Sequence, residues 1–169
     1  MTTHNSNKPI LPDSEAEMIV NCPKEINCDL RSILSIDRMR LDNGQYRRDI
    51  ELNNPKFKLR MTIRQLAEDP IDFSVILFFE SDEGYTYIIR RYNGDHGIHH
   101  NRLSGENIRG PHIHKITEQY QLGGYREDGY AEPTDGYKTI NQAVALFVSD
   151  MNIRPRGLSG NSRMCDFYE

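Results

Sequence analysis

The sequence lacks the features that mark membrane-spanning or secreted proteins. Its 169 residues contain no apolar run near the roughly 18 residues that a membrane-spanning helix needs, and the N-terminus has no apolar signal-peptide segment. Apolar residues make up only 37% of the chain, and the mean hydropathy is −0.71. We therefore expect a cytoplasmic protein of one domain, with a small core and no membrane contact.

Cysteines are few, and the motifs of nucleotide-dependent enzymes are missing. Cys22, Cys28 and Cys165 show no CxxC spacing and predict free thiols in a reducing compartment. The glycine-rich residues 123–129 lack the lysine and hydroxyl residue of a P-loop, and the chain has no GxGxxG unit between a strand and a helix. A serine nucleophile elbow is missing too. We expect no cofactor.

Positive charge is scarce outside the middle of the chain. The formal net charge is −4, which argues against a general polyanion binder. Residues 36–115 carry thirteen Lys and Arg against twelve Asp and Glu, whereas both flanking segments are acidic. Any basic surface is therefore local and lies in the segment that also holds most of the histidines.

Several segments predict β-strands. Residues 57–64 alternate between apolar and mostly cationic side chains, as in a half-buried strand. Residues 73–79 are apolar on both faces, as in a central strand. Asn43-Gly44 predicts the turn of a hairpin. The predicted strands are residues 34–42, 45–52, 57–64, 73–79, 85–92 and 112–120.

Two further segments predict helices. Asp13 is placed as the N-cap of a short helix that Pro23 ends. Residues 139–152 repeat apolar side chains at helical spacing, and Thr139 with Gln142 matches a capping box.

The order of these segments predicts an α+β fold. Residues 11–153 would form a single domain, an antiparallel sheet with the short N-terminal helix and the amphipathic C-terminal helix packed on one face. Glycine-rich residues 93–111 and 121–137 predict long loops. We expect residues 1–10 to be disordered and residues 154–169 to form a polar tail.

One segment concentrates side chains that can carry chemistry. Residues 96–114 hold five of the six histidines, and histidine both titrates near neutral pH and is the commonest metal ligand. Side chains alternate along a strand, so His112 and His114 would share one face, roughly 6–7 Å apart, and Ile113 and Lys115 would face the other way. We therefore place the candidate site here.

A first interpretation of this site is general acid–base catalysis. Cleavage of RNA needs a base for the 2′-hydroxyl, an acid for the 5′-oxygen and cations for the charge that develops on the phosphate. The candidate catalytic residues are His100, His112, His114 and Arg91. The candidate nucleic-acid-binding residues are Lys58, Arg60, Arg64, Arg90 and Lys115.

A second interpretation is a metal site. His96 with His99 has HxxH spacing, and the His-x-His pair on a strand is a recurrent ligand arrangement. Candidate third ligands are His100, Asp95 and Glu118. The neighbouring arginines disfavour a cation, so we expect no bound metal. A third interpretation gives the histidines structural hydrogen bonds or a place in a protein-binding surface.

The histidine pair also carries a family resemblance. Gly110-Pro111-His112-Ile113-His114, followed by Glu118 and Tyr120, resembles the core motif of an uncharacterised bacterial family carried on prophages and other mobile elements. His100-Asn101, Tyr130-Ala131-Glu132-Pro133 and Asn152-Ile153 also resemble that family's pattern, which covers roughly residues 11–153. The resemblance implies a mobile-element protein and carries no assigned activity.

A fainter resemblance is to the TumE-type toxins of toxin–antitoxin systems. These place a strand ending in arginine and an aromatic residue before a loop with paired histidines, then a Pro-His-x-x-His-like segment and a terminal helix. Pro111-His112-Ile113-His114 has one residue fewer between its histidines. The resemblance favours a toxin-like, metal-independent ribonuclease, with RNA or a cognate antitoxin as partner. The alternative is a non-catalytic protein that binds a host or defence protein; the oligomeric state is not predicted.

Overall fold

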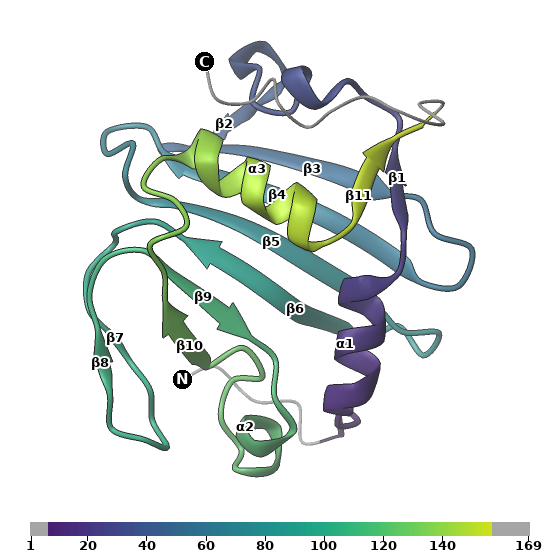
Figure 1. Ribbon diagram of the computed structural model, residues 1–169, viewed down its shortest axis with the longest axis vertical. Helices are drawn as coiled ribbons and strands as arrows, with labels where there is room; N and C mark the ends of the chain where they lie inside the picture. Colours follow the sequence, from purple (N-terminus) through teal and green to yellow (C-terminus); the bar gives the residue numbers. More distant parts are fainter. Residues whose placement is uncertain (1–6, 157–169) are drawn as a thin grey trace.

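The computed structural model describes residues 7–156, and its largest element is a seven-stranded antiparallel sheet (Figure 1). The strands follow the order β10-β9-β6-β5-β4-β3-β2. Their bounds are β2 Arg40–Asp42, β3 Gln45–Leu52, β4 Lys58–Leu66, β5 Phe73–Glu80, β6 Thr86–Asn93, β9 His112–Lys115 and β10 Tyr130–Pro133. The predicted α+β fold, a single domain with helices near both ends, is confirmed.

Both longer helices lie across one face of this sheet (Figure 1). Helix α3, Ile140–Asp150, begins with the predicted capping box, in which Thr139 and Gln142 bond each other's backbone. Helix α1, Asp13–Asn21, has Pro12 rather than Asp13 as its N-cap. The prediction for Asp13 was wrong because its carboxylate accepts the backbone N–H of a distant residue, Glu118, at 2.8 Å instead.

The two faces of the sheet differ in composition, and β4 shows how. Leu59, Met61 and Ile63 are buried against the helices, as the alternation predicted. Arg60 and Arg64 point to the opposite side. We call the side under α1 and α3 the core face, and the side that carries Arg60 and Arg64 the polar face.

A parallel strand pair extends the core beside α3. It joins β1, Lys24–Ile26, to β11, Ile153–Pro155. The ammonium group of the fully buried Lys24 donates to the carbonyl oxygens of Val20, Cys22 and Met151 at 2.8–2.9 Å, which caps the ends of both helices. Burial lowers the pKa of Lys24. The prediction of a polar tail over residues 154–169 is therefore wrong at its start, because β11 pairs with β1 there. Residues 157–169 lie outside the described range.

Three predicted boundaries at the edges of the sheet differ from the structure. The strand predicted over 34–42 is confined to β2, because 3-10 helices occupy Leu30–Ser32 and Ile36–Arg38. The strand predicted over 112–120 ends at Lys115, since the Thr117 hydroxyl accepts the backbone N–H of Tyr120 and starts helix α2, Glu118–Leu122. The predicted loop 121–137 contains β10, which pairs with β9.

The predicted loop 93–111 contains a small hairpin. Its strands are β7, His99–His100, and β8, Asn107–Ile108. It lies beside the β9–β10 end of the sheet (Figure 1).

The prediction of disorder over residues 1–10 was wrong for its last part. The Lys8 ammonium forms an ion pair with Glu127 and lies over the ring of Tyr87, 4.1 Å from its centroid. These contacts hold residues 7–10 against the sheet, while residues 1–6 are outside the described range.

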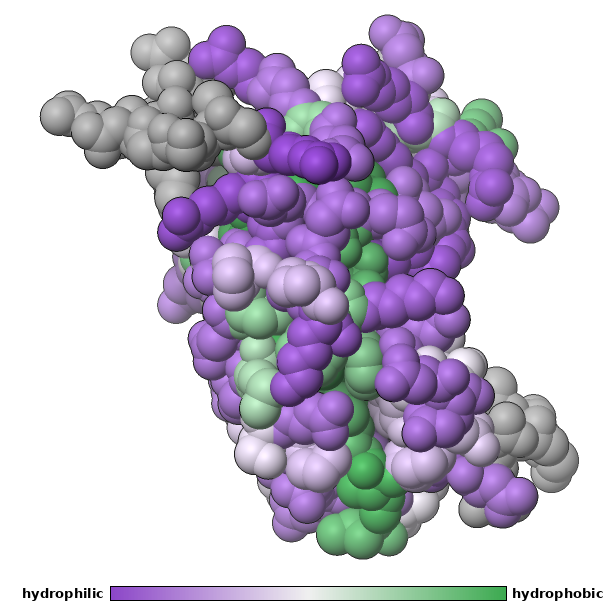
Figure 2. Space-filling view, turned by 90° about the vertical axis from the view of Figure 1, so that its right-hand side faces the viewer, coloured by the Kyte–Doolittle hydropathy of each residue, from purple (hydrophilic) through white to green (hydrophobic). Residues whose placement is uncertain are grey.

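The surface is mainly hydrophilic in the view of Figure 2, with a narrow hydrophobic band that widens at the lower end. Cys22 and Cys28 are free thiols, and Cys165 lies outside the described residues. Within residues 7–156, no helix has both the length and the apolar character needed to cross a membrane.

Candidate metal centre

The His-x-His pair lies on the polar face of the sheet, on strand β9. His112 and His114 are both buried, while Ile113 between them is only half-buried. The antiparallel register with β6 places His114 beside Arg91 and His112 beside Asn93. The predicted sharing of one face by His112 and His114 is therefore confirmed.

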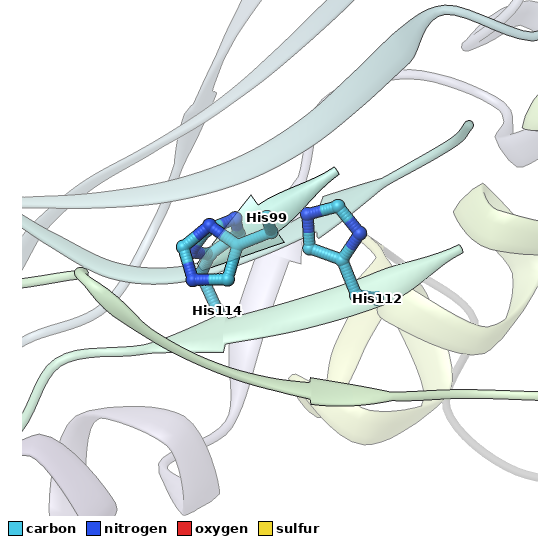
Figure 3. Close-up of side chains that lie close together, drawn as sticks. All are labelled: His99, His112 and His114. Carbon is cyan, nitrogen blue, oxygen red and sulfur yellow. The ribbon is translucent and has the colours of Figure 1, made fainter. Parts of the chain in front are cut away.

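A third histidine reaches the pair from the β7–β8 hairpin. The ring centroid of His99 lies 4.6 Å from that of His114 and 5.4 Å from that of His112, and the two β9 rings are 4.9 Å apart. One nitrogen from each ring lies within 4.8 Å of the others (Figure 3). The three side chains thus form a compact cluster, which we call the histidine triad: His99, His112 and His114.

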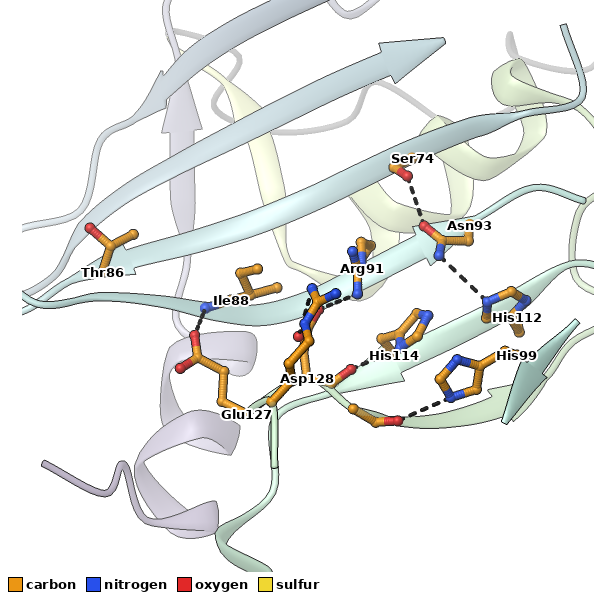
Figure 4. Close-up of polar contacts among 12 residues, drawn as sticks. Ser74, Thr86, Ile88, Arg91, Asn93, His99, His112, His114, Glu127 and Asp128 are labelled. Atoms are coloured by element: carbon orange, nitrogen blue, oxygen red, sulfur yellow. Dashed lines mark hydrogen bonds and ion pairs between the residues drawn. The ribbon is translucent and has the colours of Figure 1, made fainter. Parts of the chain in front are cut away.

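Each ring of the triad has one nitrogen that bonds a backbone carbonyl; Figure 4 shows these bonds for His99 and His114. Nδ1 of His112 donates to Gly110 O at 2.7 Å, and Nδ1 of His114 donates to Asp128 O at 2.8 Å. Nε2 of His99 donates to Gly129 O at 3.0 Å. A carbonyl oxygen only accepts, so these three nitrogens carry the protons. The other nitrogens, Nε2 of His112 and His114 and Nδ1 of His99, are therefore unprotonated. Nε2 of His112 lies 3.4 Å from the amide nitrogen of Asn93, and the other two have no hydrogen-bond partner among the described residues.

The hairpin that carries His99 is attached to the sheet by Asn101. This side chain is fully buried; its amide nitrogen donates to Ala131 O at 2.8 Å, and its oxygen accepts from Ala131 N at 2.9 Å. The same oxygen accepts from Nε2 of His99 at 3.2 Å. Asn101 thereby fixes both the position of the hairpin and the orientation of the His99 ring.

Both β9 histidines are neutral at physiological pH. Burial and the nearby Arg91 lower the pKa of His114 to about 2. Burial also lowers the pKa of His112, and the neighbouring histidines His96 and His99 lower it further. Two buried, uncharged imidazoles therefore face each other at the centre of the triad.

The triad borders a cavity of about 350 Å³ on the polar face. His99 and His114 line it together with Arg64, Arg91 and Arg126. Arg91 and Arg126 both form ion pairs with the buried carboxylate of Asp128 (Figure 4). Asp72 also lines the cavity, which is thus a polar space with three arginines and two carboxylates beside the histidines.

An exposed histidine stands beside the same cavity. The His96 ring centroid lies 5.2 Å from that of His112, and Nε2 of His96 is 2.8 Å from the amide nitrogen of Asn93. The amide oxygen of Asn93 accepts from the Ser74 hydroxyl at 2.8 Å, so its nitrogen is the donor to His96. His96 is therefore held near the triad without being one of its members.

Of the four candidate catalytic residues, the structure brings together His112, His114 and Arg91. His100 is exposed on the outer side of the hairpin, where its Nδ1 lies 2.8 Å from the side-chain oxygen of Asn107. The neighbouring His99 occupies the position in the site that the sequence analysis gave to His100.

The five candidate nucleic-acid-binding residues divide between the two faces. Lys58, Arg60 and Arg64 alternate along β4 on the polar face, the face of the triad. Arg90 and Lys115 point away from it: Arg90 forms an ion pair with Glu17 of α1, and Lys115 one with Glu132 of β10. Only the β4 group therefore shares a surface with the site.

Several parts of the site have no signal in the sequence. Asp128 and Arg126 lie in a segment predicted as loop, and their contacts to Arg91 depend on the path of that loop. Glu118, a candidate third ligand, begins α2 and bonds Asp13 instead. Asn101 follows the hairpin histidines directly, but only the packing of the hairpin shows its role.

Comparison with family models, with curated proteins and with solved structures finds no match for this chain. The resemblances to the mobile-element family and to the TumE-type toxins therefore stay predictions from the sequence.

Proposed function

We propose that this chain is a metal-dependent hydrolase whose ion is bound by His99, His112 and His114. The observation that carries the proposal is the clustering of three imidazoles: one nitrogen from each ring lies within 4.8 Å of the others, and each ring donates an N–H to a backbone carbonyl. Metal-binding histidines characteristically donate their second nitrogen in this way, which fixes the tautomer and the ring orientation.

The protonation of the pair supports a metal over the metal-independent mechanism expected from the sequence. A general acid must carry a proton at working pH, and an effective base has a pKa near that pH. His114, with a pKa of about 2, meets neither condition. A metal ion, by contrast, requires a neutral imidazole.

The spacing of the three nitrogens fits a small divalent ion after a modest closure. Ligands at about 2.0–2.1 Å from a tetrahedral Zn²⁺ lie about 3.3 Å from one another. The three nitrogens lie within 4.8 Å of one another, so small shifts of the three side chains would bring them to this spacing. Three nitrogen ligands leave one tetrahedral position for water or substrate, as in catalytic zinc sites.

Water on such an ion ionises near neutral pH and becomes a nucleophile. His96, exposed beside the cavity and 5.2 Å from His112 between ring centroids, would accept the proton on Nε2 by giving up its hydrogen bond from Asn93. RNA is the candidate substrate, because Lys58, Arg60 and Arg64 lie on the same sheet face as the triad. The half-buried Arg91 lies beside His114, where charge on a bound phosphate would develop.

Metal binding is the first test, by calorimetry with Zn²⁺ followed by metal analysis of the dialysed protein. We expect one ion per chain, and His99→Ala should weaken binding by more than the 10–100-fold typical of losing an outer-shell partner. His100→Ala is the matched control, since it removes the adjacent, exposed histidine. His99 is half-buried on a hairpin, so its loss should leave the circular-dichroism spectrum unchanged.

Cleavage of a labelled RNA, with and without chelator, then tests the hydrolase. We expect activity that chelator removes, Zn²⁺ restores and His99→Ala abolishes. Cleavage that resists chelator but is lost in His114→Ala would replace the proposal with the metal-independent mechanism. A protein that binds Zn²⁺ and cleaves no RNA would contradict RNA as substrate, and one that binds no divalent ion would contradict the metal centre.

A further inference from the structure

Three arginines line the cavity beside the histidine triad, and they come from separate parts of the chain. Arg64 extends from β4, Arg91 from β6, and Arg126 from the segment before β10. β5 separates β4 from β6, so Arg64 and Arg91 stand about 10 Å apart across the sheet. Arginine side chains are long enough for the two guanidinium groups to approach one another above β5.

Arg64 is the member of this group that has no counter-ion. It is half-buried, and within residues 7–156 its side chain forms neither a hydrogen bond nor an ion pair; Asp49 and Asp72 act on it only as more distant charges. Burial lowers the pKa of Arg64, and the positive charges of Arg47 and Arg126 lower it further. A guanidinium held in partial burial next to like charges is unfavourable unless an anion compensates it.

Arg91 has donor capacity left in the same space. One of its terminal nitrogens bonds Asp128, but its Nε is buried and has no hydrogen-bond partner among the described residues. Arg126 shares the same carboxylate, and its side chain is 60% exposed, so it can turn towards a ligand. Two arginines thus share one carboxylate, and a third has none.

Neutral hydrogen-bonding groups complete the lining of the cavity. Ser74 and Asn93 lie between Arg64 and the histidine triad, in the same row of the sheet as Arg64 and His112. The combination of planar guanidinium donors with hydroxyl and amide groups suits the oxygens of a phosphate group.

We propose that Arg64, Arg91 and Arg126 form a phosphate-binding subsite, so that the substrate is a phosphate ester whose phosphoryl group lies between the arginines and the histidine triad. The inference rests on the proposed function for the placement of the reaction, but phosphate binding itself needs no metal. It gives the substrate class as phosphomonoesters and phosphodiesters, of which RNA is one. Arg64 contributes a guanidinium that forms no ion pair among the described residues, and it is therefore the determining residue.

A calorimetric titration of the metal-free protein with inorganic phosphate tests the phosphate-binding subsite independently of the metal. We expect binding that Arg64→Gln weakens about tenfold or more, because a charge-assisted hydrogen-bonding group is lost. Arg154→Gln is the matched control: it makes the same change in net charge at an exposed position of β11, and it should leave phosphate affinity unchanged.

Two further titrations separate this inference from the metal proposal. Zn²⁺ should bind Arg64→Gln as tightly as wild type, which also shows that the variant folds, and phosphate should still bind metal-free His99→Ala. Equal phosphate affinity in wild type, Arg64→Gln and Arg154→Gln, or no phosphate binding by wild type, would overturn the subsite whatever the metal result. If phosphate binds as expected but no metal does, the subsite stands and the hydrolase fails.

Two larger ligands test which kind of phosphate ester the subsite binds. A nucleoside monophosphate presents a terminal phosphate, and a diribonucleotide presents an internal diester. Tighter binding of either than of inorganic phosphate, lost in Arg64→Gln, would support the subsite and identify the ester. If both bind wild type and Arg64→Gln equally, the arginines are not the phosphate-binding group.

Discussion

The two faces of the central sheet are built from the same strands but serve different purposes. Neighbouring residues of β6 show the contrast: Arg90 points under helix α1 and pairs with Glu17, while Arg91 points to the cavity and pairs with Asp128. On β9 the same alternation separates Ile113 from His112 and His114. The core face determines whether the chain folds, and the polar face carries the groups that can bind a ligand.

The largest expected effect is on the core face. Phe147 of α3 is fully buried and meets Tyr92 edge-on at 5.2 Å between ring centroids. Phe147→Ala should lower the free energy of unfolding by about 3–5 kcal/mol, because it leaves a cavity in the core. Urea denaturation measures this.

The matching substitution on the polar face is Phe78→Ala. Phe78 is half-buried, with the Arg60 guanidinium 4.7 Å from its ring centroid. Its loss should cost about 1 kcal/mol. Equal costs for Phe147→Ala and Phe78→Ala would break the distinction between the faces.

A second comparison uses the adjacent arginines. Arg91→Gln leaves the buried Asp128 with only the outer Arg126, and should lower the free energy of unfolding by about 3 kcal/mol. It should also weaken phosphate binding by metal-free protein. Arg90→Gln loses an ion pair to Glu17, whose side chain is 58% exposed, and should cost about 1 kcal/mol. Phosphate affinity that falls as much in Arg90→Gln as in Arg91→Gln would show that phosphate binding is not confined to the polar face.

The last prediction concerns the pH dependence that His114 gives to the metal-free protein. Its pKa is about 2 in the folded chain, against an ordinary value of 6.5, so the unfolded chain takes up a proton first as the pH falls. Stability is fully present above pH 6.5 and should fall by about 1.4 kcal/mol per pH unit and per proton below it.

Urea denaturation between pH 6.5 and 5 checks this slope, before most carboxylates titrate. His114→Gln should reduce this slope by the contribution of one proton, about 1.4 kcal/mol per pH unit. The control His100→Gln, at an exposed histidine, should leave the slope unchanged. A slope unchanged by His114→Gln would mean that this histidine titrates normally in the folded chain.

Much of the fold could be predicted because its longer elements carry a periodic pattern. The apolar alternation of β4 and the helical spacing of α3 arise from burial of one side of each element. The short strands β1, β7, β8, β10 and β11 were missed, since two to four residues contain too little of any period. Their pairing is decided by contacts far away in the chain, such as the Lys24 ammonium on the carbonyl oxygen of Met151.

The candidate site was predictable to the same degree and for the same reason. His112 and His114 share a face because a strand alternates, which needs no knowledge of the rest of the fold. The choice between His99 and His100 does need it. These neighbours point in opposite directions, and the way Asn101 attaches the hairpin to Ala131 decides which one enters the site.

The bonds of Asn101 also bear on how the molecule meets other chains. Strand β10 ends the sheet, and an unpaired outer strand is a template on which another chain can add by β-pairing. The Asn101 amide occupies both the N–H and the C=O of Ala131 at the middle of that strand. The residue that orients His99 therefore also protects this edge strand from pairing with another chain. A substitution that releases the hairpin would both expose the edge of β10 and disrupt the site.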